Sequence, residues 1–145
     1  MSQPIQILMV EDNPADVELT KEAFSDGKLS NSLHIVHDGE EALDYLYKRA
    51  RFANVETPDI ILLDLNLPKI SGKEVLATLK GDASLSSIPV IILSSSEDSE
   101  DIKASYALNA NSFVTKPVAI DDFLAVVKSV EHFWVEVVKL PFDKR

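Results

Sequence analysis

Five short, mostly apolar runs alternate along the chain with stretches whose apolar residues recur every three or four positions. This alternation restricts the possible folds more than any other feature of the sequence. The runs cover residues 5–10, 33–36, 60–63, 90–93 and 112–115. Runs that stay apolar, rather than alternating with polar residues, are typical of strands buried on both faces. Strands separated by helical stretches are joined by crossovers and lie parallel. The pattern therefore predicts an α/β fold in which helices cover both faces of a five-stranded parallel sheet.

Helix start signals and apolar periodicity predict where the helices lie. Asn13 is a suitable cap in front of a helix that begins at Pro14. The second helix is expected to present one apolar face, followed by a loop over residues 51–57; that face consists of Ala42, Leu43, Leu46, Tyr47 and Ala50. The last helical stretch has an apolar stripe that is longer than one small domain needs, at positions 123, 126, 127, 130, 133, 134 and 137.

The balance of charge argues against nonspecific binding to nucleic acid. The 145 residues include 24 acidic and 14 basic side chains, and the net charge of −10 would repel phosphates. The chain has no cysteine, so neither a disulfide framework nor a thiolate metal site can form. The apolar run at residues 5–10 is too short for a signal peptide or a membrane span, and two acids follow it at once. We expect a soluble, cytoplasmic protein that binds neither nucleic acid nor membrane.

Polar side chains with complementary chemistry stand at the carboxyl ends of four predicted strands. Glu11 and Asp12 follow the first run, Asp64 the third, Ser94 the fourth and Lys116 the fifth. Ligands bind at this edge of a parallel sheet, so we expect the side chains to converge there. Neighbouring carboxylates repel one another unless a cation lies among them, and Mg²⁺ suits such carboxylates together with a phosphate. One acid could then accept a phosphoryl group while a metal ion, an ammonium and a hydroxyl neutralise charge on the transferred oxygens.

Four motifs in this order make the sequence resemble the receiver-domain family of two-component response regulators. They are Val10-Glu11-Asp12-Asn13, Ile60-Ile61-Leu62-Leu63-Asp64-Leu65-Asn66-Leu67-Pro68 with Gly72 behind it, Pro89-Val90-Ile91-Ile92-Leu93-Ser94, and Phe113-Val114-Thr115-Lys116-Pro117. The resemblance extends from Ile5 to about Val137 and implies a doubly wound sheet with strand order 2-1-3-4-5 and five flanking helices. We accordingly expect a single receiver domain over residues 1–145, with a C-terminal extension from about 131 to 145 and no output domain.

The resemblance also implies which residues bind metal and which one accepts the phosphoryl group. Glu11 and Asp12 would hold Mg²⁺. Asp64 would be phosphorylated and would also bind the metal, and the backbone carbonyl of Asn66 would complete the protein ligands.

Three further residues would respond to the phosphoryl group. Lys116 would contact it, and its peptide bond to Pro117 would be cis. Ser94 matches the switch hydroxyl of the family, and Phe113 matches its aromatic switch position. Such a domain is a signalling switch rather than an enzyme, although it assists its own phosphorylation and slow autodephosphorylation.

Two segments indicate partners. The loop over residues 51–57 and the segment 132–141 look like those of stand-alone receivers that serve bacterial phytochrome histidine kinases, so the implied partner is a sensor histidine kinase of that kind. We also expect a homodimer through the fourth and fifth βα units and the C-terminal stripe. A monomer cannot easily bury Phe123, Trp134 and Val137 against one sheet, because about 20 helical residues extend roughly 30 Å.

Two other functions use related features. Phosphohydrolases of the haloacid-dehalogenase type also place an Asp nucleophile after a parallel strand, with a second Asp two residues on as acid/base. Here that position is Asn66, which cannot exchange a proton in that role, so fast turnover is not expected. A receiver-like interaction module that is never phosphorylated is disfavoured because no member of the set of acids, hydroxyl and lysine is missing.

Overall fold

The computed structural model describes residues 4–25, 30–65, 67–94, 112–116 and 120–129, and its sheet has the predicted topology. The strands are β1 (Ile5–Val10), β2 (Asn31–Val36), β3 (Ile60–Asp64), β4 (Val90–Ser94) and β5 (Ser112–Thr115). They form one sheet in the order β2-β1-β3-β4-β5, and every neighbouring pair is parallel. The prediction of a doubly wound five-stranded α/β fold is confirmed.

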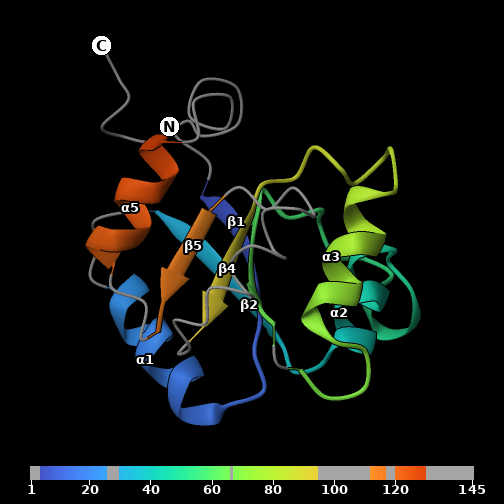
Figure 1. Cartoon of the computed structure of the whole chain (residues 1–145), viewed down its shortest axis with the longest axis horizontal. Coiled ribbons are helices and arrows are strands. Elements are labelled where there is room, and N and C mark those ends of the chain that lie inside the picture. The colour runs from blue at the N-terminus through green and yellow to red at the C-terminus, as the bar shows by residue number, and fades with distance from the viewer. Residues whose placement is uncertain (1–3, 26–29, 66, 95–111, 117–119, 130–145) are drawn as a thin grey trace.

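Helices cover both faces of this sheet. They are α1 (Pro14–Phe24), α2 (Gly39–Leu46), α3 (Gly72–Lys80) and α5 (Ile120–Ser129). Helices α1 and α5 lie on one face, and α2 and α3 lie on the other (Figure 1). The fifth expected helix, between β4 and β5, falls on residues 95–111, outside the described part of the chain.

Successive residues of the central strands point to opposite faces, so each strand contributes to two cores. On β3, Ile61 and Leu63 join the cluster under α2 and α3, whereas Ile60 and Leu62 join the cluster under α1 and α5. All four are fully buried. This two-sided burial explains why the strand sequences stay apolar instead of alternating.

The first helix begins where the sequence predicts. The side chain of Asn13 accepts hydrogen bonds from the backbone N–H groups of Ala15 and Asp16, at 2.9 and 3.2 Å, which satisfies two donors at the helix start. Pro14 occupies the first helical position. The chain therefore turns sharply from the end of β1 into α1, next to the carboxyl edge of the sheet.

The predicted face of the second helix is partly wrong. Helix α2 ends at Leu46, because Lys48 and Ala50 have positive φ angles of 57° and 53° and leave the helical conformation. Tyr45 is buried instead of Tyr47, which is 36% exposed. The loop expected over residues 51–57 overlaps a short 3₁₀ helix, η1 (Ala50–Phe52), which buries Phe52 against Tyr45 with ring centroids 5.2 Å apart.

The expectation that a monomer cannot easily bury Phe123, Trp134 and Val137 is wrong for Phe123. Phe123 of α5 is fully buried within this chain, where its ring packs against Phe24 of α1 with centroids 4.8 Å apart. The expected extension from about 131 to 145, with Trp134 and Val137, lies outside the described residues. Among the helices that the structure describes, none is both long and apolar enough to span a bilayer.

Candidate functional site: acids and a lysine at the strand ends

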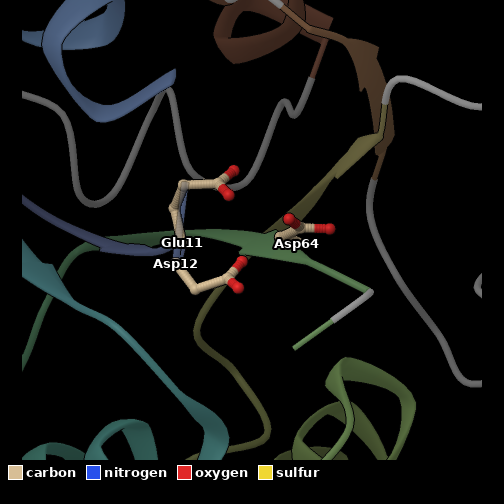
Figure 2. A group of neighbouring side chains, drawn as sticks. All are labelled: Glu11, Asp12 and Asp64. Carbon is tan, nitrogen blue, oxygen red and sulfur yellow. The ribbon is translucent and has the colours of Figure 1, made fainter. Parts of the chain in front are cut away.

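Three carboxylates gather at the carboxyl ends of β1 and β3. Glu11 and Asp12 directly follow β1, and Asp64 is the last residue of β3. The register pairs Val10 with Leu63, so the parallel strands end side by side and bring the acids together. One carboxylate oxygen from each residue lies within 4.8 Å of the others. Figure 2 shows these three side chains at the ends of the two strands.

The environments of the three acids differ. Glu11 is fully buried and Asp64 is 3% exposed, whereas Asp12 is exposed to solvent. Glu11 is held from two sides: its backbone N–H donates to the carbonyl of Val36 at 3.0 Å, and its Oε2 accepts from the backbone N–H of Asn13 at 3.1 Å. Glu11 is therefore fixed in place, whereas the exposed Asp12 borders water.

Lys116 supplies the positive charge. It follows β5, whose residue Thr115 pairs with Ser94, and its side chain reaches the acids past β4. Its Nζ donates to Glu11 Oε1 at 2.9 Å and to Asp64 Oδ2 at 3.1 Å, and it forms an ion pair with Asp16 Oδ2 at 3.0 Å. One ammonium thus contacts three carboxylates from two separate segments of the chain.

The pKa values reflect the crowding of these charges. Burial raises the pKa of the Glu11 carboxyl to about 7 even though hydrogen bonds from Lys116 and the Asn13 amide act in the opposite direction; the charge of Asp64 adds to the rise. Burial alone would lower the pKa of Lys116, but its hydrogen bonds with Glu11, Asp16 and Asp64 outweigh that effect and hold the pKa above its ordinary value. The lysine stays charged, and the site has more acid than one ammonium can neutralise.

This donor set fits a hard divalent cation. Carboxylate oxygens are the ligands that such ions prefer, and a cation among the acids would offset the charge of Asp64, which adds to the rise in the pKa of Glu11 caused mainly by burial. Three acidic oxygens within 4.8 Å of one another, on fixed backbone at adjacent strand ends, are close enough to share one ion. The site can therefore bind a divalent metal with Glu11, Asp12 and Asp64.

The structure brings together four of the seven residues predicted for the site: Glu11, Asp12, Asp64 and Lys116. Ser94 ends β4, in the strand next to Asp64, and Phe113 lies on β5 in register with Ile92. The side chains of Ser94 and Phe113 are outside the described part, as are Asn66 and the Lys116–Pro117 bond.

The sequence analysis missed Asp16. This residue stands in the first turn of α1, where an acid is usually explained by the helix dipole alone. A signal was nevertheless available: a helix that starts two residues after a strand-end acid keeps its first turn near the same edge of the sheet.

The fold and the site together define a receiver-type α/β domain, and comparison with known proteins agrees. The family model "Response regulator receiver domain" matches residues 7–128. The chain belongs to this family of response regulator receiver domains, and it is a phosphoacceptor response regulator of two-component signalling. Neither the haloacid-dehalogenase-type phosphohydrolase nor the inert interaction module is favoured by this match.

Two response regulators are similar to this chain over almost their full length. "Response regulator Rcp1" of Synechocystis sp. is 41% identical over 138 residues, which cover 95% of this chain and 94% of the relative. The structure of the Mn²⁺-bound form of Rcp1 has a TM-score of 0.76 at 40% identity, with 95% of this chain and 99% of that chain covered. The phosphorylated cyanobacterial phytochrome response regulator RcpA has a TM-score of 0.78 at 42% identity, with 96% and 99% covered.

Proposed function

We propose that this receiver takes a phosphoryl group on Asp64 from the phosphohistidine of a sensor histidine kinase and relays the signal by a change of conformation. One observation carries the proposal: the ammonium of Lys116 lies 3.1 Å from Asp64 Oδ2 at the ends of the parallel strands. An aspartate held beside a fixed cation can receive an anionic group that it would otherwise repel.

The transfer exchanges one bond for another. A carboxylate oxygen of Asp64 attacks phosphorus, the P–N bond to the kinase histidine breaks, and the imidazole leaves with the electron pair of that bond. An acyl phosphate results on Asp64. Lys116 offsets the negative charge of the carboxylate beforehand and of the phosphoryl oxygens afterwards, because its pKa is held above the ordinary value.

Mg²⁺ is the divalent ion that we assign to the acidic cluster. Glu11, Asp12 and Asp64 would hold it, with the backbone carbonyl of Asn66 as the remaining protein ligand. Mg²⁺ prefers one or two carboxylates plus phosphate oxygens and keeps several waters, which suits a cluster whose acid Asp12 is exposed to solvent. When bound, the ion would neutralise charge on the transferred phosphoryl oxygens.

Ser94 and Phe113 would transmit the change of conformation that follows phosphorylation of Asp64. Ser94 ends the strand next to Asp64, where a hydroxyl could reach a phosphoryl oxygen, and Phe113 lies on the following strand. Loss of the phosphoryl group would be slow, because Asn66 stands where a phosphohydrolase would need an acid/base. The chain would therefore act as a switch and not as a turnover enzyme.

The partner that we propose is a phytochrome-type histidine kinase. Its support is the similarity to the bacteriophytochrome response regulator AtBRR, with a TM-score of 0.80 at 43% identity, and to RcpA. We also retain homodimerisation as a proposal. Phe123 no longer supports it, since that side chain is buried within the monomer, so the remaining motive is the apolar sequence around Trp134 and Val137.

The test is to mix the protein with phosphoramidate and Mg²⁺ and to measure its intact mass. We expect one added phosphoryl group on the wild type and none on Asp64→Asn, which removes only the attacking oxygen and its charge. Asp44→Asn makes the same change on α2, where Asp44 pairs with Arg49 at 3.1 Å, and should be labelled like the wild type. Continued labelling of Asp64→Asn would identify another acceptor and contradict the proposal.

A further inference from the structure

Asp16 forms the third close contact of the Lys116 ammonium, an ion pair beside the two hydrogen bonds to Glu11 and Asp64. A lysine ammonium has three N–H donors and no acceptor. In this structure three carboxylate oxygens surround Nζ: Glu11 Oε1 at 2.9 Å, Asp16 Oδ2 at 3.0 Å and Asp64 Oδ2 at 3.1 Å. Three carboxylates therefore crowd the ammonium, and an arriving phosphoryl group has to displace one of the three contacts.

The three contacts differ in what it costs to break them. The side chain of Glu11 is completely buried, so losing Lys116 would leave a charge without its partner in a dry environment. Asp64 is 5% exposed at its side chain and carries the phosphoryl group itself. The side chain of Asp16 is 23% exposed and can turn to water when Lys116 leaves. Asp16 is therefore the contact that is least costly to give up.

Asp16 is also separate from the metal cluster. The three acids that lie within 4.8 Å of one another are Glu11, Asp12 and Asp64, without Asp16. Its backbone N–H is tied to the side chain of Asn13 at 3.2 Å in the first turn of α1, which fixes its position beside Lys116. A substitution at Asp16 can thus change the contacts of the Lys116 ammonium without removing a metal ligand.

We infer that Asp16 is a positioning residue that holds Lys116 in the unphosphorylated protein and competes with the phosphoryl group for its ammonium. This inference rests on the proposed phosphorylation of Asp64. Asp16 adds a negative charge close to the place where an anionic group arrives, and it occupies the donor which that group requires. Its presence lowers the affinity of the site for a phosphoryl group and so sets how readily the switch turns on.

The test compares Asp16→Asn with the wild type in two measurements. The first is the rate of phosphorylation by acetyl phosphate at saturating Mg²⁺, followed by intact mass. The second is the affinity for beryllofluoride, a phosphoryl mimic that binds without turnover, followed by ¹⁹F NMR. We expect Asp16→Asn to raise both by about three- to tenfold, the size of the interaction between two unit charges a few ångströms apart when water screens them.

Matched variants distinguish this role from a general effect of removing negative charge. Glu18→Gln removes one negative charge from the same helix, where Glu18 is 73% exposed and lies 3.5 Å from Lys21. This variant should change neither the phosphorylation rate nor the beryllofluoride affinity by more than about twofold. Asp16→Glu keeps the charge and should stay close to the wild type. Mg²⁺ affinity of Asp16→Asn should remain within about twofold of the wild type, because no ligand is lost.

The dependence on Lys116 is the decisive outcome. In a Lys116→Met background, Asp16→Asn should raise the affinity for beryllofluoride clearly less than it does in the wild-type background, because only the direct repulsion by the Asp16 charge is then relieved. An equal gain in that background, an equal gain in Glu18→Gln, or no gain in Asp16→Asn would overturn the inference. Should Asp16→Asn not fold, Asp16→Ser removes the same charge and provides the same test. A wild type that takes no label would instead contradict the proposed function itself.

Discussion

Gly72, the first residue of α3, lies directly against the backbone of Asp64. Its N–H donates to the carbonyl of Leu65 at 3.0 Å, and a Cβ atom on Gly72 would overlap the carbonyl oxygen of Asp64. The helix thus starts against the end of β3, and the chain between them has to turn within a few residues. The absence of a side chain at position 72 is what allows the strand end and the helix start to touch.

Gly72→Ala should therefore destabilise the protein. The added methyl group meets backbone rather than a flexible side chain, so either β3 or α3 has to shift, at a cost of about 1–3 kcal/mol. Urea denaturation followed by far-UV circular dichroism measures the loss. Gly81→Ala is the control: its Cβ would lie 3.2 Å from the nearest atom at a φ of −85°, and we expect a change below about 1 kcal/mol. Equal effects of the two variants would contradict the proposed close contact at Gly72.

Phe123→Ala should be among the most damaging substitutions in α5. The ring is fully buried against Phe24, and removing such a ring costs about 3–5 kcal/mol through lost burial and the cavity left behind. Leu19→Ala on α1 is the matched control, because that side chain is 47% exposed and its truncation should cost below about 0.5 kcal/mol. Thermal denaturation of the three proteins at equal concentration provides the comparison. A Phe123→Ala variant as stable as the control would mean that α5 does not pack on α1 in solution.

Asp12→Asn should weaken the binding of Mg²⁺ by about tenfold or more, since affinity for a hard cation depends on the number of carboxylates. Mn²⁺ should be affected in the same direction. Glu40→Gln makes an equal change of charge on α2, where Glu40 pairs with Lys69 at 3.4 Å, and should leave the affinity nearly unchanged. Isothermal titration calorimetry measures the Mg²⁺ affinity of both variants. If both variants lost the same affinity, long-range charge and not ligation would explain the binding.

Trp134→Glu should abolish self-association. We expect the wild type to sediment as a dimer at high micromolar concentration and the variant as a monomer, because a charge cannot be buried in an apolar contact without a partner. Leu19→Glu introduces the same charge on α1, outside the proposed interface, and should remain dimeric. A wild type that stays monomeric with and without phosphodonor would rule out the dimer.

The sequence alone predicted the sheet and most of the acidic site for one physical reason. Strands buried on both faces have to be apolar, so the runs around Ile7, Leu62 and Ile91 stand out, and the polar residue that ends each run marks the carboxyl edge. The strand order then places Glu11 and Asp64 on neighbouring strand ends. The structure brings these acids and Lys116 together, while their roles in phosphoryl transfer remain predictions.

Contacts between distant segments determine the structural features that the sequence alone did not predict. The periodicity of the second helix continues past Leu46, but the left-handed backbone at Lys48 ends it and puts Tyr45 in the core. The ring of Phe123 packs against that of Phe24, 99 positions earlier in the chain (123 − 24), and only the tertiary structure reveals this contact.

The position of Asp16 depends on the same kind of contact. In the sequence it is an acid in the first turn of a helix; in the fold, Lys116 follows the edge strand β5 and its Nζ lies 3.0 Å from Asp16 Oδ2. Local sequence determines which residues are buried in strands and which end them, because that depends on each residue and its near neighbours. Which charges meet depends on how the helices and strands pack, and only the tertiary structure determines that.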